Sequence, residues 1–163
     1  KQIEGVEATQ VGYANGNIAN PTYQQDVPAT RPGEKEESYP VLYLLDGDSF
    51  FHSVVGFTRL FSTSKVSSLP PCIVVAVLNT NRTRDLTPTC SAARRDGTVR
   101  PGDKPEGGGA GQFCRFLTEE LRPAVEQNLP VNGQHLLAGH SYAGLFTLHV
   151  LLNYPGAFDT YIA

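Results

Sequence analysis

Residues 135–146 read HLLAGHSYAGLF, and the fold is indicated most directly by this stretch. Residues 135–139 are predicted to form a short apolar strand, and residues 145–154 a helix. The residues between them suit a tight strand-to-helix turn, because bulky side chains two positions before and after Ser141 would clash. A serine in such a turn adopts strained backbone geometry and exposes its hydroxyl group. The pattern therefore predicts a nucleophilic serine at the carboxyl end of a strand.

Ser141 is the candidate nucleophile, and the backbone N–H of Tyr142 is a candidate for stabilising an oxyanion. That N–H lies at the start of the helix and would point to the place where negative charge develops. The alternative is that Ser141 only caps the helix, since Gly-x-Ser-x-Gly matches are common. Ala143 stands where the pattern has its second glycine, and a methyl group still fits there. The strand–turn–helix context favours the nucleophile.

Two upstream apolar runs predict strands that are buried on both faces, at residues 41–45 and 73–78. A helix with Ser49 as its cap is predicted over residues 49–66. The loop between the first strand and this helix reads Asp46-Gly47-Asp48. Hydrolases with this strand–loop–helix order take a second oxyanion donor from such a loop, and Asp48 N–H is our candidate. Taken alone, the loop would be an ordinary turn.

The remaining pattern predicts a single α/β domain over residues 1–163. A helical period begins at residue 112 and is closed by Pro130 and Gly133, and another strand begins in residues 158–163. An edge strand is predicted within residues 3–13. Strands alternate with helices, so we expect a mostly parallel central sheet with helices on both faces, a three-layer arrangement.

Composition excludes several classes of function. The formal net charge of −3 leaves no basic footprint for nucleic acid, and no apolar run is long enough to span a membrane. Three cysteines without close pair spacing argue against a disulfide framework or a zinc site, and favour slightly a reducing compartment such as the cytoplasm. No cofactor or metal is predicted, and the pattern says nothing about oligomeric state.

Residues 79–111 are predicted to form a long loop, and a loop of this length in a compact domain is usually functional or mobile. Its glycine-rich end at residues 106–111 lacks the Gly-Lys-Ser/Thr ending of a phosphate-binding loop. Arginines make the loop locally basic, which fits either a solvated loop or a rim that receives an anionic group. Arg84 and Asp85 form a third possibility, an ion pair that orders the loop near the site.

Four stretches together resemble one known family. They read YPVLYLLDG at residues 39–47, NRTRDLTP at 81–88, GGAGQF at 108–113 and GHSYAGLF at 139–146. In this order they resemble the siderophore-esterase-like branch of the esterase family of α/β-hydrolases. The resemblance runs from about residue 39 to residue 163 and implies an α/β-hydrolase fold.

The resemblance also implies a serine, an acid and a histidine in that order along the chain. Only 22 residues follow Ser141. His149 lies roughly 12 Å of helix rise away, which is beyond hydrogen-bond reach. His52, His135 and His140 precede the serine.

Asp159 is the one acid after Ser141, and the resemblance places it on the next strand. We therefore expect this chain to be the N-terminal part of a hydrolase, with the acid and histidine of the triad outside it.

The sequence thus predicts a serine carboxylic-ester hydrolase that works through an acyl-enzyme on Ser141. The resemblance implies a small-molecule ester substrate, small or siderophore-like. Two alternatives remain at this point: a non-catalytic binding domain on a hydrolase scaffold, and an acyltransferase that shares the first half-reaction.

Overall fold

The computed structural model describes residues 6–10, 22–26, 28, 38–63, 69–94 and 96–163. Its centre is a six-stranded sheet with the strand order β1-β2-β4-β3-β7-β8. These strands are β1 (Val6–Gln10), β2 (Thr22–Asp26), β3 (Tyr39–Leu44), β4 (Ile73–Val77), β7 (Val131–Ala138) and β8 (Thr160–Ile162). Four neighbours, β4, β3, β7 and β8, run parallel, whereas β1 and β2 join the β4 side antiparallel. The expectation of a mostly parallel sheet is confirmed.

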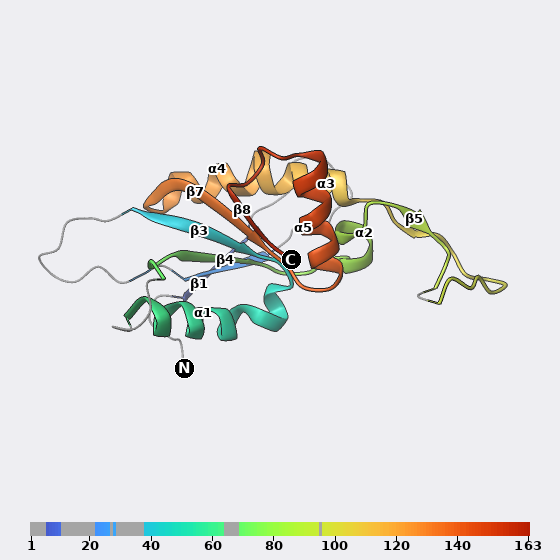
Figure 1. Cartoon of the computed structure of the whole chain (residues 1–163), viewed down its shortest axis with the longest axis horizontal. Coiled ribbons are helices and arrows are strands. Elements are labelled where there is room, and N and C mark those ends of the chain that lie inside the picture. The colour runs from blue at the N-terminus through green and yellow to red at the C-terminus, as the bar shows by residue number, and fades with distance from the viewer. Residues whose placement is uncertain (1–5, 11–21, 27, 29–37, 64–68, 95) are drawn as a thin grey trace, which may run out of the picture.

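Helices cover both faces of this sheet (Figure 1). One face carries α1 (Gly47–Thr63). The other carries α5 (Tyr142–Asn153) and a continuous helical stretch made of α3 (Ala110–Arg115), the π-helical segment η1 (Phe116–Leu121) and α4 (Arg122–Asn128). The molecule is therefore a three-layer sandwich.

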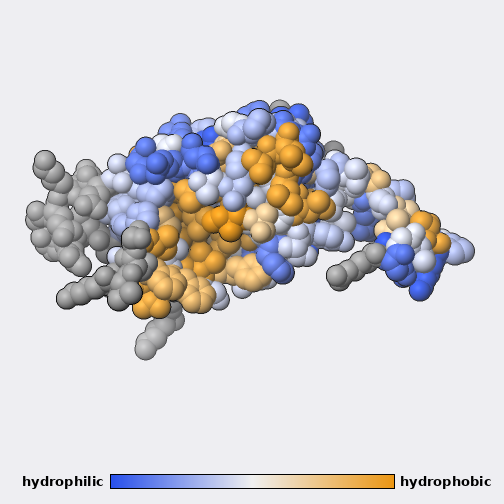
Figure 2. All heavy atoms as spheres, in the orientation of Figure 1, coloured by the Kyte–Doolittle hydropathy of each residue, from blue (hydrophilic) through white to orange (hydrophobic). Residues whose placement is uncertain are grey.

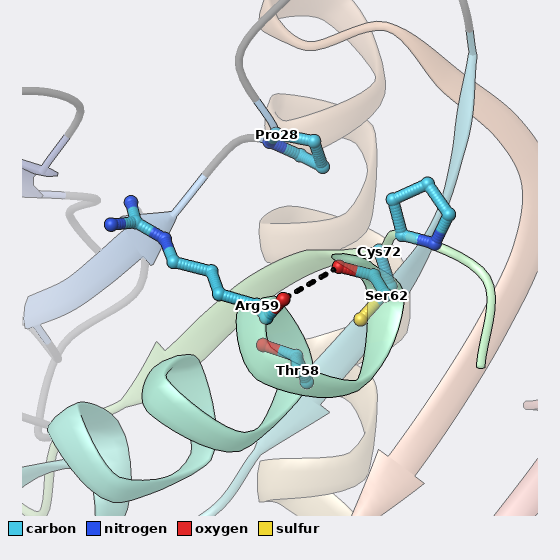
Figure 3. Close-up of a pocket in the computed structure, with 6 residues that line it drawn as sticks. Pro28, Thr58, Arg59, Ser62 and Cys72 are labelled. Carbon is cyan, nitrogen blue, oxygen red and sulfur yellow. Dashed lines mark hydrogen bonds between the residues drawn. The ribbon is translucent and has the colours of Figure 1, made fainter. Parts of the chain in front are cut away.

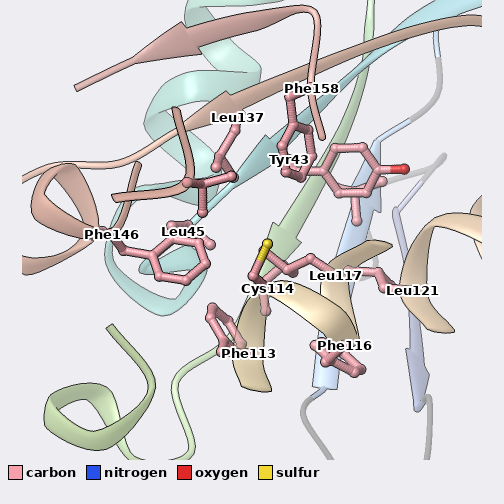
Figure 4. Close-up of a cluster of buried hydrophobic side chains, with 14 of the residues drawn as sticks. Tyr43, Leu45, Phe113, Cys114, Phe116, Leu117, Leu121, Leu137, Phe146 and Phe158 are labelled. Atoms are coloured by element: carbon pink, nitrogen blue, oxygen red, sulfur yellow. The ribbon is translucent and has the colours of Figure 1, made fainter. Parts of the chain in front are cut away.

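Along the buried strands, successive side chains point alternately to the two helical layers. Val41 and Tyr43 of β3 face the α3–α5 side, where the larger apolar cluster lies, and Leu42 and Leu44 face α1. Figure 4 shows aromatic and aliphatic side chains of the larger cluster packed between the sheet and the helices, among them Phe146. This explains why the strand reads as a continuous apolar run: both of its faces are buried.

Several predicted boundaries need correction. The helix after β3 begins at Gly47, so Ser49 lies inside it and does not cap it. The predicted end of that helix, at residue 66, lies outside the described residues. The helix after Ser141 begins at Tyr142, three residues earlier than predicted, because the first turn of α5 forms part of the tight turn. Within the predicted edge-strand region, residues 6–10 do form the edge strand β1, but β2 was not predicted.

The predicted loop at residues 79–111 is not structureless. It contains the short helix α2 (Arg82–Leu86), and the two-residue strands β5 (Cys90–Ser91) and β6 (Glu106–Gly107) pair antiparallel. The described residues between β5 and β6, 92–94 and 96–105, project from the body of the molecule as an arm (Figure 1). The arm lies on the same side of the molecule as the N-terminal end of α5.

One face of the molecule exposes apolar side chains over both α5 and α1 (Figure 2). The exposed residues of α5 include Leu145, Leu148 and Leu152, and those of α1 include Phe57 and Leu60. Among the helices that the structure describes, none has the length and apolar character needed to cross a membrane.

Candidate active site

Two loops meet at the carboxyl edge of the sheet because their strands are neighbours. Leu44 at the end of β3 pairs with Ala138 at the end of β7, and the next residue, Leu45, donates its N–H to the Ala138 carbonyl at 2.9 Å. Segment 46–48, which is Asp46 and the start of α1, and loop 139–141 therefore leave adjacent strands side by side. The rings of Phe50 and His140 lie 6.0 Å apart, which adds a contact between the two segments.

Ser141 has the backbone geometry of a strained turn. Its φ and ψ are 61° and −119°, and its side chain makes no hydrogen bond to the helix that follows. A serine that served only as a helix cap would accept such a bond, so the geometry argues against the capping alternative. A Cβ on Gly139 would lie 2.4 Å from the Ala143 carbonyl oxygen, which explains the glycine. Ala143 itself is fully buried, so its methyl group is accommodated.

The two candidate oxyanion donors lie at the first turns of α5 and α1. Within the described residues, the N–H groups of Tyr142 and Asp48 have no hydrogen-bond partner. The neighbouring N–H groups of Ser49 and Phe50 are already bonded to the Asp46 carbonyl, at 2.9 and 3.2 Å. Unpaired N–H groups at helix N-termini are suited to stabilising negative charge. Both N–H groups are therefore available as hydrogen-bond donors.

Asp46 forms a buried polar centre that the sequence analysis did not single out. Its backbone has φ 55°, and its side chain is 4% exposed. Arg82 donates to both carboxylate oxygens, at 2.7 and 2.8 Å, and Asn79 donates at 2.8 Å. The amide group of Asn79 also reaches the Asp48 carboxylate at 2.9 Å. The acidic loop directly after a buried strand was the available signal, but nothing in it pointed to these partners.

The electrostatics of this centre favour a charged pair. Burial acts to raise the pKa of Asp46, but hydrogen bonds from Arg82 and Asn79 outweigh it, with smaller contributions from the charges of Arg82 and His140, and hold the pKa below its ordinary value. The hydrogen bond to Asp46 likewise raises the pKa of Arg82. The guanidinium carbon of Arg82 also lies 5.2 Å from the centre of the Tyr142 ring. One arginine thus contacts both site loops.

Most arginines that the structure describes in the predicted basic loop are paired with carboxylates. Besides Arg82, Arg84 binds Asp85 at 2.6 Å, which confirms the ion pair considered for this segment. Arg94 binds Asp103 at 2.7 Å on the arm. Much of the positive charge of the described part of this loop is therefore already compensated by carboxylates.

A hollow of about 520 Å³ lies between Tyr142 and the arm. Its lining includes Thr83 of α2, Arg94 and Lys104 of the arm, and Glu106 of β6. Another hollow, of about 30 Å³, lies near the C-terminal end of α1, where Ser62 donates to the Arg59 carbonyl (Figure 3). The position and size of the first hollow make it the better place for a substrate.

Comparison with known proteins identifies the family. Residues 20–163 match the family model described as "Putative esterase". The chain belongs to this esterase family. It is 34% identical to the ferri-bacillibactin esterase BesA of Bacillus subtilis over 173 aligned positions, which cover 97% of this chain and 58% of BesA.

Solved structures place the esterase chain within the α/β-hydrolase fold, as predicted. An IroE-like serine hydrolase from Shewanella oneidensis superposes with a TM-score of 0.83 and 30% identity, over 94% of this chain and 48% of that one. The enterobactin hydrolase IroE, solved in complex with DFP, superposes with a TM-score of 0.70 and 30% identity, over 96% of this chain and 61% of IroE. The esterase chain thus spans about half the length of these relatives.

No histidine bonds to Ser141 within the described part of the esterase chain. His149 contacts Asn153, with 3.1 Å between its Nδ1 and the amide nitrogen. His52 lies exposed on α1, and the ring of the exposed His140 packs against Phe50.

His135 is buried in β7, where its Nε2 lies 3.0 Å from the Glu126 carboxylate. Burial, followed by the charge of Arg122, lowers its pKa. Asp159 lies directly before β8, and its carboxylate accepts the His135 N–H at 2.7 Å. The acid that the resemblance placed on the next strand is therefore used in backbone pairing. Among the described residues, no group of three or more His, Cys, Asp or Glu side chains could hold a metal ion.

Proposed function

We propose that this chain carries the nucleophile and oxyanion site of a serine esterase that hydrolyses carboxylic esters through an acyl-enzyme. The observation that carries the proposal is Ser141, held at φ 61° and ψ −119° between β7 and α5 with its hydroxyl group unbonded to the helix. Such strain is costly and is typically retained where the side chain has a chemical role.

In the acylation step, the Oγ of Ser141 attacks the carbonyl carbon of the ester, and the hydroxyl proton passes to a general base. The bond from that carbon to the alcohol oxygen then breaks, and the base returns the proton to the departing alcohol. Water, deprotonated by the same base, hydrolyses the acyl-enzyme and regenerates the hydroxyl group of Ser141. The N–H groups of Tyr142 and Asp48 stabilise the negative oxygen of each tetrahedral intermediate.

The general base and its acid are proposed to come from the part of the relatives' length that this chain does not span. The order serine, acid, histidine in this fold supports that assignment, as does the placement of the chain's own histidines. His135 is paired with Glu126, and His149 with Asn153.

The proposed substrate is an ester of a siderophore-like small molecule. BesA is named a ferri-bacillibactin esterase, and IroE is named an enterobactin hydrolase. The hollow of about 520 Å³ beside Tyr142 is of the size that binds small molecules, and the arm forms one of its walls. The comparisons offer no support for a non-catalytic or acyl-transfer role.

The test is covalent labelling of the whole protein by diisopropyl fluorophosphate, followed by intact mass measurement and peptide mapping. We expect one adduct on Ser141 and none after Ser141→Ala, with Ser53→Ala on the exposed surface of α1 as the matched control. Hydrolysis of a siderophore ester by the whole protein should fall by about 10³-fold or more in Ser141→Ala. Equal hydrolysis by both proteins, or labelling at another residue, would overturn the proposal.

A further inference from the structure

Asp46 occupies the N-cap position of α1, but its carboxylate accepts no hydrogen bond from the first turn of that helix. Its carbonyl oxygen accepts the N–H groups of Ser49 and Phe50, which makes it the residue before the first turn of α1. An aspartate at this position normally turns its carboxylate towards the N–H two or three residues later. Here those groups are the N–H of Asp48 and that of Ser49. A carboxylate on Asp48 N–H would occupy the donor that we assign to the oxyanion.

Arg82 and Asn79 hold the Asp46 carboxylate in a different direction. Arg82 donates hydrogen bonds to both oxygens through Nε and one terminal nitrogen, at 2.7 and 2.8 Å, and Asn79 donates another at 2.8 Å. Both partners come from the segment after β4, which neighbours β3 in the sheet. A paired guanidinium–carboxylate contact of this kind is stronger and more directional than a single neutral hydrogen bond.

We propose that Arg82 and Asn79 are positioning residues that keep the oxyanion site open by holding the Asp46 carboxylate away from Asp48 N–H. This inference rests on the proposed function, because it concerns the same donor. On this proposal, the buried ion pair of Arg82 and Asp46 does more than stabilise the fold.

Two further observations support this role. The Arg82 charge compensates a carboxylate that would otherwise oppose the negative oxygen formed during ester hydrolysis. The guanidinium group also packs over the ring of Tyr142, whose own N–H is the second donor. One side chain therefore keeps the first donor unoccupied and contacts the residue that provides the second.

The experiment is a double-mutant comparison in the whole protein with two readouts. The first is the rate of Ser141 labelling by diisopropyl fluorophosphate. The second is the amide hydrogen exchange rate of Asp48, measured by NMR, which requires no activity. In Arg82→Ala the released carboxylate should cap Asp48, so labelling should slow by about 10²-fold. Exchange at Asp48 should slow by about fivefold.

The variant Asp46→Ala/Arg82→Ala has no carboxylate to occupy the donor. We expect it to label at least tenfold faster than Arg82→Ala and to exchange at Asp48 at the original rate. A purely structural role predicts that Arg82→Ala leaves exchange at Asp48 unchanged or makes it faster, because a loosened loop exposes that amide to solvent. Asn79→Ala keeps the ion pair between Arg82 and Asp46, so it should slow labelling and exchange less than Arg82→Ala does. It replaces Arg82→Ala in the comparison if that variant does not fold.

Arg84→Ala is the matched control for exchange, since Arg84 binds Asp85 and not Asp46. It should leave exchange at Asp48 unchanged. If the double variant labels as slowly as Arg82→Ala and exchange at Asp48 does not change, the positioning role is wrong while the esterase proposal stands. If no variant labels but exchange follows the expected order, the positioning role stands and the proposed function fails.

Discussion

Asp46 and Ser141 occupy equivalent places in two loops and are stabilised in opposite ways. Each follows a parallel strand, precedes a helix, and has a positive φ, 55° for Asp46 and 61° for Ser141. The Asp46 side chain is buried and accepts three hydrogen bonds from Arg82 and Asn79. The Ser141 side chain is exposed and makes none to its helix.

This difference fits the two roles proposed: Asp46 supports the neighbouring loop, and Ser141 is the reactive group. Residues other than glycine rarely adopt a positive φ, and aspartate is among those that tolerate it better. The side-chain bonds of Asp46 offset its strain. Ser141 is instead held through its backbone, by the close approach of Gly139 to Ala143, which leaves its hydroxyl group available. A nucleophile needs that availability, whereas a residue that shapes the neighbouring loop does not.

The largest expected effect is that of Gly139→Ala. The added methyl group would lie 2.4 Å from the Ala143 carbonyl oxygen, so the backbone that holds Ser141 must move. We expect a loss of about 3 kcal/mol in the free energy of unfolding, measured by urea titration. Gly56→Ala is the matched control, because nothing lies within 4 Å of its new Cβ and it is expected to be neutral or stabilising. Equal effects at the two glycines would contradict the backbone account of Ser141.

Asp46→Gly should come next. Glycine accepts the positive φ without strain, but the variant loses every bond to Arg82 and Asn79. We expect a net loss of about 2 kcal/mol in the free energy of unfolding, since hydrogen bonds to charged groups contribute more than neutral ones. A gain in stability would show that the strain at Asp46 exceeds what its side chain contributes.

Ser141→Gly should have the opposite sign and be smaller. It relieves the same kind of strain and removes a side chain with no bond to the helix, at a cost in the entropy of the unfolded chain. We expect a gain of about 1 kcal/mol in the same titration, together with complete loss of labelling by diisopropyl fluorophosphate. A loss of stability would mean that the Ser141 hydroxyl group supports the fold.

The smallest effect concerns pH. Because its partners hold the pKa of Asp46 below the unfolded value of about 3.9, the unfolded chain binds the proton more readily. The stabilising contribution is complete above about pH 4 and is lost as the pH falls through the lower folded-state pKa. The stability difference between the wild-type protein and Asp46→Asn should therefore shrink below about pH 4. A difference that stays constant down to about pH 2 would argue against an ionised Asp46.

The sequence predicted the parts of the site that depend on short-range pattern. Ser141 and Tyr142 follow from an apolar strand, small residues and a helix within twenty positions, and Asp48 from a loop after a buried strand. Their catalytic roles stay predictions. The partners of Asp46 could not be found in this way, since Asn79 and Arg82 lie 33 and 36 positions away. Their residue types are common in solvated loops.

By itself, the sequence determined which segments are buried strands and where the strained turn lies, because burial on both faces and tight turns impose their own residue patterns. The tertiary structure alone decided that β3 stands between β4 and β7. That order brings segment 46–48, the segment after β4 and loop 139–141 to one edge of the sheet. The physical reason is that strand order depends on hydrogen-bonded ladders between backbones, and backbones are the same for every sequence. Only the packing of whole layers selects which strands pair, and with them which side chains meet around Ser141.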